Sequence, residues 1–140
     1  MTTIATDGQS MAGDGRITFH DYIVNETSVK VRRLPSGSLI GFCGDSGDDI
    51  VFEEWLERGG KKPKLSSGFS ALVLTQGRRP RTYFYDCTFD EIDPPYAIGS
   101  GARFAFAAMD CGKSPEEAVR IAAGRCTKTG GKVTVLTLTT

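Results

Sequence analysis

Short apolar segments occur in pairs along the chain, and in several of them apolar and polar residues alternate as they do in half-buried β-strands. A turn signal separates the members of each pair, so each pair predicts a β-hairpin. The pairs are residues 2–6 with 9–13 across Asp7-Gly8, KVRRL with SLIGFCG across Pro35-Ser36-Gly37, and FSALVLT with RTYFYDC across QGRRP. The final segment, KVTVLTLTT, also predicts a strand, whereas the polar stretch through His20 and Asn25 predicts a loop.

Helix signals occur in other parts of the sequence. In GDSGDDIVFEEWLERGG, Asp45 or Ser46 can cap the N-terminus of a helix, and two glycines end it. The apolar stripe predicted for this helix consists of Ile50, Val51, Trp55 and Leu56. A second helix is predicted in the Ala-rich segment GARFAFAAMDCG, which follows the short segment YAIGSG.

The third predicted helix, SPEEAVRIAAGRC, has the strongest start signal. Ser114 is the N-cap, Pro115 takes the first helical position, and Glu117 stands three residues after the cap. The element order is therefore strands, helix, strands, two helices and a strand. This order predicts an α+β fold in which helices pack outside sheets, within one domain that covers residues 1–140.

Charge and hydropathy exclude several classes of partner. The chain has 17 basic and 17 acidic residues, so it has no overall field that favours nucleic acid or an anionic membrane. The sequence has no apolar run approaching the ~18 residues of a spanning helix and no signal-peptide pattern at its start. We therefore expect a cytoplasmic protein that binds neither nucleic acid nor membrane.

Cysteine and histidine usage narrows the chemistry further. Four cysteines lie at wide spacings without a Cys-x-x-Cys pair, and His20 is the single histidine. This pattern argues against a zinc site with thiolate or imidazole ligands. A Ser-His-Asp or Cys-His mechanism would have to use His20, which lies in the polar stretch FHDYIVNET.

Thr2 offers a different nucleophile. If Met1 is removed, the hydroxyl of Thr2 and its free α-amine form a nucleophile and base within one residue. A free α-amine has a reference pKa of about 7.7–8.0, which suits a base at neutral pH. A neighbouring ammonium group would keep the amine neutral, and a carboxylate would hold that ammonium in place. Alternatively, Thr-Thr-Ile-Ala-Thr is only an exposed first strand.

Four further residues are candidates for the supporting roles, although each also has a plain structural reading. Asp14 closes the first hairpin, and Lys30 begins the second. Gly44 ends a strand, where its N–H could face an oxyanion, and Ser100 begins a helical stretch. Spacing alone does not bring these residues together.

Their combination resembles the HslV family of proteasome-related peptidases, within the N-terminal-nucleophile hydrolases. The matching motifs are TTIAT, AGDGRIT, KVRRL, GFCGDSGD before a helix, and YAIGSGARFAFAA. They agree in order and approximate spacing over residues 1–60 and 96–129. The resemblance implies an αββα four-layer sandwich, in which two antiparallel sheets lie between layers of helices.

The resemblance also implies a role for each candidate. Thr2 would be the nucleophile through its Oγ, with its own amine as the base. Lys30 would tune the amine and Asp14 would orient Lys30. Ser100 would assist proton transfer, and the N–H of Gly44 would stabilise the oxyanion.

Substrate and ion contacts follow from the same resemblance. Thr18 and Ser46 match substrate-binding positions, and Thr18 would bind a substrate backbone by strand addition. AAGRCTKT matches a loop whose carbonyls, here those of Ala123, Cys126 and Thr129, hold a monovalent cation such as Na⁺. The resemblance implies no required cofactor. It implies a polypeptide substrate, a ring of identical subunits and an AAA+ unfoldase as partner.

The sequence departs from the family between the first helix and the third hairpin. Only GGKKPKLSSG stands where the family has a second helix, so one outer-layer helix is missing. We expect this loss to leave the apolar strand FSALVLT uncovered until another subunit buries it. The uncovered strand is therefore a second reason to expect a homo-oligomer.

Two other functions stay open. A non-catalytic assembly or interaction protein could keep the same fold, and the missing helix and the presence of Met1 both favour it, because an amide nitrogen on Thr2 cannot serve as a base. A terminal threonine could also hydrolyse a small amide, although no motif in the sequence favours this activity.

Overall fold

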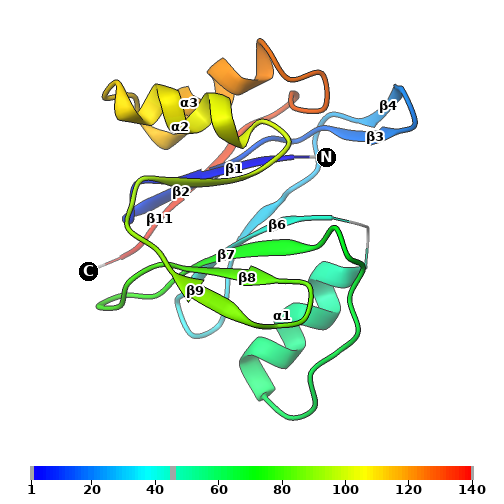
Figure 1. Cartoon of the computed structure of the whole chain (residues 1–140), viewed down its shortest axis with the longest axis vertical. Helices are drawn as coiled ribbons and strands as arrows, with labels where there is room; N and C mark the ends of the chain where they lie inside the picture. The colour runs from blue at the N-terminus through cyan, green and yellow to red at the C-terminus, as the bar shows by residue number, and fades with distance from the viewer. Residues whose placement is uncertain (1, 45–46, 140) are drawn as a thin grey trace.

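The computed structural model describes residues 2–44 and 47–139, which form two antiparallel sheets with helices on their outer faces (Figure 1). The first sheet has the spatial order β10 (Tyr96–Gly99), β1 (Thr3–Thr6), β2 (Ser10–Gly13) and β11 (Thr134–Thr137). The second has the order β5 (Val31–Arg33), β6 (Leu39–Cys43), β7 (Ser70–Leu74), β8 (Arg81–Phe84) and β9 (Phe89–Glu91). The three predicted hairpins are confirmed as β1–β2, β5–β6 and β7–β8.

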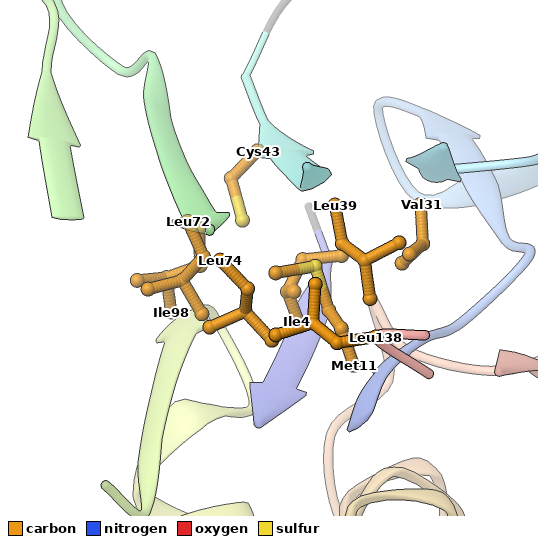
Figure 2. Packing of buried hydrophobic residues seen from close by; sticks show 9 residues of the cluster. All are labelled: Ile4, Met11, Val31, Leu39, Cys43, Leu72, Leu74, Ile98 and Leu138. Carbon is orange, nitrogen blue, oxygen red and sulfur yellow. The ribbon is translucent and has the colours of Figure 1, made fainter. Parts of the chain in front are cut away.

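Apolar side chains from both sheets fill the space between them (Figure 2). Ile4, Met11, Leu39 and Leu72 are completely buried there. A Cβ atom on Gly41 of β6 would lie 2.6 Å from the Cγ2 of Ile4, so only glycine allows the sheets to approach this closely. This packing fixes β1, and with it Thr2, against the second sheet.

Two helices cover the outer face of the first sheet. These are α2 (Ala102–Asp110) and α3 (Pro115–Ala123), and alanines from both helices and from the strands below form the contact. Ser114 and Glu117 form the predicted capping box at the start of α3, since each side chain accepts a hydrogen bond from the other residue's N–H. The sequence signal for this helix is confirmed.

The outer face of the second sheet is covered by α1 (Asp48–Arg58). Phe52 of α1 is completely buried, and Trp55 and Leu56 pack beside it, as the i, i+3, i+4 spacing of one helix face requires. The predicted apolar stripe is wrong at Ile50 and Val51, which are 64% and 45% exposed because they lie away from that face. The capping positions proposed at residues 45 and 46 lie outside the described residues.

The four-layer αββα arrangement is therefore confirmed, and α1 is the single helix in its layer among the described residues (Figure 1). The expectation of an uncovered FSALVLT strand is wrong, because Ala71, Leu72, Val73 and Leu74 are all buried within the one chain. Besides α1, the cover comes from the segment before β7, which contributes Phe69 and Leu65. The argument for an oligomer from this strand therefore fails.

The predicted loop through His20 and Asn25 is also wrong. Ile17–Phe19 (β3) and Tyr22–Asn25 (β4) form a separate two-stranded hairpin that projects from the sandwich (Figure 1). His20 adopts a positive φ of 56° in the tight turn between them. Among the described residues, none lies in a helix long and apolar enough to cross a bilayer.

Candidate active site

Thr2 lies immediately before β1, at the end of the first sheet that faces the β3–β4 hairpin (Figure 1). The residue is only 5% exposed. Its neighbour Thr3 is fixed in two directions, because its N–H donates to Oδ1 of Asp14 over 3.1 Å and its Oγ1 lies 2.7 Å from that of Thr129. These contacts hold the backbone of Thr2 in one place.

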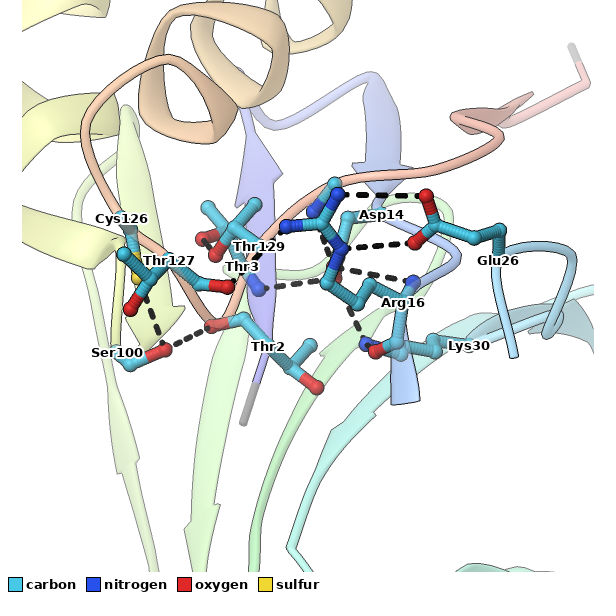
Figure 3. Close-up of polar contacts among 11 residues, drawn as sticks. Thr2, Thr3, Asp14, Arg16, Glu26, Lys30, Ser100, Cys126, Thr127 and Thr129 are labelled. Atoms are coloured by element: carbon cyan, nitrogen blue, oxygen red, sulfur yellow. Dashed lines mark hydrogen bonds and ion pairs between the residues drawn. The ribbon is translucent and has the colours of Figure 1, made fainter. Parts of the chain in front are cut away.

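A buried ion pair stands beside Thr2 (Figure 3). Nζ of Lys30 lies 2.9 Å from Oδ1 of Asp14 and also donates to the carbonyl oxygen of Arg16 over 2.5 Å. The Asp14 side chain is completely buried, but backbone N–H groups of Thr3, Arg16 and Gly130 also donate to its oxygens. These donors compensate the carboxylate for the loss of water, so the pair can persist inside the protein.

A pocket of about 790 Å³ opens next to this pair. Thr2, Thr18, Lys30 and Gly44 all line it, so the fold brings together four of the residues singled out in the sequence. The apolar lining includes Phe19, Val24, Val29, Phe42 and Phe69. A hydroxyl, an ammonium group and an apolar wall therefore share a space large enough for several side chains of a bound peptide.

Gly44 follows β6 at the edge of the pocket, in a conformation that only glycine adopts readily. Its φ is +128°, and a Cβ there would lie 2.9 Å from Cα of Phe69. The backbone of Gly44 thus packs against the backbone of Gly68 and Phe69 more closely than it could with a side chain in this position.

Ser100 lies on the other side of Thr2, at the turn between β10 and α2 (Figure 3). Its Oγ donates to the carbonyl oxygen of Thr2 over 3.4 Å, and Sγ of Cys126 donates to Ser100 Oγ over 3.3 Å. Burial raises the pKa of the Cys126 thiol, but hydrogen bonding with Ser100, Thr129 and nearby backbone groups outweighs burial, so the pKa is below its ordinary value.

The two remaining sets of predicted residues have different outcomes. Ser46 lies outside the described residues. Ala123 ends α3, and Cys126 and Thr129 lie in the turn that follows, where the Cys126 carbonyl accepts the N–H of Thr129 over 3.1 Å. The cation site stays a prediction.

Sequence reasoning missed the clamp that holds this turn against the site. The Arg16 guanidinium pairs with Glu26 over 2.7 Å and donates to the carbonyl oxygen of Thr127 over 3.2 Å (Figure 3). The Glu26 carbonyl in turn accepts the N–H of Lys132 over 2.7 Å. No spacing signal points to this clamp, because Arg16 and Thr127 are 111 residues apart in the sequence.

Comparison with known proteins supports the resemblance. No protein-family model matches the chain. The chain is 29% identical to the "ATP-dependent protease subunit HslV" of Roseobacter denitrificans in an alignment 159 positions long, gaps included, which covers 91% of this chain and 86% of that protein.

Two solved structures have the same fold. The Thiobacillus denitrificans protein BPH aligns with a TM-score of 0.73 at 19% identity, over 99% of this chain and 98% of that one. The eukaryotic HslV from Trypanosoma brucei aligns with a TM-score of 0.72 at 20% identity, over 97% and 98%. The chain is therefore similar in sequence to an HslV protease subunit, and it has the same fold as these two solved structures.

Proposed function

We propose that this chain is a threonine peptidase of the proteasome type, with Thr2 as the nucleophile after hydrolysis of the Met1–Thr2 bond. One observation carries the proposal. Thr2 and Lys30 line the same pocket, and the Lys30 ammonium group is held by the buried carboxylate of Asp14. A positive charge beside a terminal amine favours its neutral form, which is the form that accepts a proton.

The reaction would proceed in two steps. Oγ of Thr2 attacks the carbonyl carbon of a peptide bond while its proton passes to the α-amine. The amine then gives this proton to the leaving nitrogen, the C–N bond breaks, and an ester joins Thr2 to the acyl half of the substrate. Water hydrolyses the ester in the second step, which releases a carboxylic acid and restores the hydroxyl.

Neighbouring residues would supply the remaining parts. We assign the oxyanion contact to the N–H of Gly44, which lines the pocket at the end of β6. Ser100, which already donates to the Thr2 carbonyl, would assist proton transfer. Thr18 lies in β3, and β3 pairs only with β4 among the described residues, so its other edge can accept an extended substrate. Ser46 would provide a second substrate contact.

The cation site belongs to the same proposal. The Cys126 carbonyl uses one lone pair on the N–H of Thr129 and keeps the second for an ion. Carbonyl oxygens of Ala123 and Thr129 would complete a set of hard ligands suited to a monovalent cation such as Na⁺. Its role would be to hold the turn that carries Cys126 beside Ser100.

Assembly and partner are proposed from the relative. That protein is named as a subunit of an ATP-dependent protease. We propose that copies of this chain form a homo-oligomeric ring and receive unfolded polypeptides from an AAA+ unfoldase. Mass photometry of the purified protein tests the first part, and a monodisperse monomer at micromolar concentration would contradict it.

The intact mass of the protein from its native host tests the nucleophile. The mass should lack Met1, and a peptide vinyl sulfone should add one inhibitor per chain. Thr2→Ala should abolish labelling, while Thr137→Ala, at an exposed threonine of β11, should keep it. Retention of Met1, or labelling that persists in Thr2→Ala, would contradict the proposal and favour the assembly protein.

A further inference from the structure

Buried and half-buried polar side chains lie behind Thr2, and the nearest of them, Ser100, contacts the Thr2 carbonyl oxygen (Figure 3). Thr3 Oγ1 lies 2.7 Å from Thr129 Oγ1, and the N–H of Thr129 donates to the carbonyl oxygen of Cys126 over 3.1 Å. The sulfur of Cys126 contacts Ser100 Oγ at 3.3 Å, and Ser100 contacts Thr2 O at 3.4 Å. The thiol of Cys126 is therefore the group through which the turn after α3 contacts the Ser100 side chain.

The direction of the hydrogen bonds is fixed at Ser100. Its hydroxyl has one proton, and the carbonyl oxygen of Thr2 can only accept, so Ser100 uses that proton on Thr2. The contact between Cys126 and Ser100 then requires the thiol to donate its proton to Ser100 Oγ. Without this donor, Ser100 would lose one of the two contacts that hold its side chain.

Cys126 differs from the other buried cysteines in its surroundings. Cys43 lies in the apolar cluster between the sheets, and Cys87 lies in the apolar cluster under α1. Cys126 is 9% exposed but belongs to none of the three apolar clusters, and its sulfur donates to the Ser100 hydroxyl instead. Filling apolar space therefore does not account for a thiol here.

The backbone holds the sulfur in place. The N–H of Cys126 donates to the carbonyl of Ala122 in the last turn of α3 over 2.7 Å. The Cys126 carbonyl accepts the N–H of Thr129, and Gly130 donates to Asp14. The thiol is thus carried by a turn that is anchored at both ends.

We propose that Cys126 is a positioning residue, whose thiol holds the Ser100 hydroxyl against Thr2 in the geometry needed for proton transfer. This inference rests on the proposed function, and it adds a residue that acts through Ser100 rather than on the substrate. Only the side chain is involved, so the role is separate from the proposed binding of a cation by the Cys126 carbonyl.

Turnover of a fluorogenic peptide by four proteins tests the role of the thiol. Relative to wild type, Cys126→Ala should lower kcat about fivefold to tenfold and change KM little, because one hydrogen bond is lost away from the substrate. Cys126→Ser keeps a donor and should recover part of the loss. Cys111→Ser, at an exposed cysteine, is the matched control and should behave as wild type.

A double-mutant cycle separates positioning from a general structural effect. If Cys126 acts through Ser100, Cys126→Ala should change kcat less than twofold when Ser100 is already alanine. Thermal unfolding of every variant checks that each is folded at the assay temperature. An equal loss of kcat in both backgrounds, or full activity of Cys126→Ala, would overturn the inference.

Failure of the proposed function gives a different result. A wild-type protein that shows no Thr2-dependent labelling by a peptide vinyl sulfone would overturn the proposed function and this inference together. A wild-type protein that is labelled at Thr2, with additive effects of Cys126→Ala and Ser100→Ala on kcat, would overturn the inference alone.

Discussion

The two sides of the pocket are built in opposite ways. On the Thr2 side, Asp14 is completely buried, Lys30 is nearly so, and each polar group has hydrogen-bond partners from distant parts of the chain. On the hairpin side, Phe19, Val24 and Val29 are 56%, 55% and 51% exposed. One wall is therefore rigid and polar, while the other is exposed and apolar.

This difference separates two tasks. A reacting group has to be held within a fraction of an ångström, which a buried, fully bonded network provides. Binding of a variable peptide needs apolar area and a free strand edge, which β3 and β4 supply. We therefore expect changes in the polar wall to alter kcat and stability, and changes in the apolar wall to alter KM.

The largest effect is expected from Lys30→Met, which removes the ammonium group and keeps most of the side-chain volume. We expect kcat/KM to fall about 10³-fold, since the Thr2 amine loses the charge that keeps it a base. Unfolding by urea should show a loss of about 3 kcal/mol, because Asp14 keeps its backbone donors but loses its counter-ion.

Lys113→Met is the control for Lys30→Met, because Lys113 is an exposed lysine between α2 and α3. It should leave activity as in wild type and stability within about 0.5 kcal/mol. Wild-type activity in Lys30→Met would remove Lys30 from the mechanism. It would also contradict the expectation that changes in the polar wall alter kcat.

The next effect is expected from Gly101→Ala, which tests how tightly the polar wall is packed. The new Cβ would lie 2.1 Å from Thr3 Oγ1 and 3.1 Å from Thr129 Oγ1. We expect a loss of about 2 kcal/mol in denaturant unfolding from overpacking, together with a fall in kcat as the backbone at Thr2 shifts.

Gly124→Ala is matched to Gly101→Ala. Gly124 has helical φ and ψ after α3, and the nearest atom to its added Cβ is at an ordinary 3.4 Å. Its stability should therefore change by less than about 0.5 kcal/mol. If the Gly101→Ala protein is as stable and as active as the Gly124→Ala protein, the polar wall is not rigid.

The sequence predicts residues of the polar wall better than it predicts the hairpin of the apolar wall. Motifs of the family that the chain resembles make four residues of the site recognisable, namely Thr2, Asp14, Lys30 and Gly44. Their spacing in the sequence does not show that they lie together in the fold. For example, the N–H of Gly130 reaches Asp14 across 116 residues of sequence. Such contacts follow from strand register and sheet packing, which a linear pattern does not contain.

The errors have local causes. The β3–β4 hairpin was missed because its strands are short and exposed, so they lack the alternation that burial imposes. Ile50 and Val51 were assigned to the buried face because they are apolar, although the helix phase set by Phe52, Trp55 and Leu56 turns them to solvent. The cover of β7 was underestimated because a loop, rather than a second helix, supplies it.

A smaller effect is expected from Phe19→Ser, on the apolar wall. Phe19 lines the pocket and is more than half exposed, so stability should change by less than about 0.5 kcal/mol. We expect KM for an apolar peptide to rise about threefold, with kcat unchanged, from the loss of apolar contact. Ile23→Ser, on the same hairpin but outside the pocket lining, is the control for a general effect on the hairpin. A fall in kcat with constant KM would contradict the division of tasks.

The smallest effect concerns the link between the walls, the pair of Arg16 with Glu26. The hydrogen bond from Arg16 lowers the pKa of Glu26, so the pair contributes stability above the unfolded pKa of about 4.3 and loses it as the pH falls through the folded value. Hydrogen exchange of the β3–β4 amides should therefore increase slightly below this pH relative to the two sheets. Glu26→Gln should exchange faster at neutral pH and lose that pH dependence, since an amide has no charge to titrate. If the hairpin amides of wild type and Glu26→Gln exchange alike at both pH values, the clamp does not join the apolar wall to the polar one.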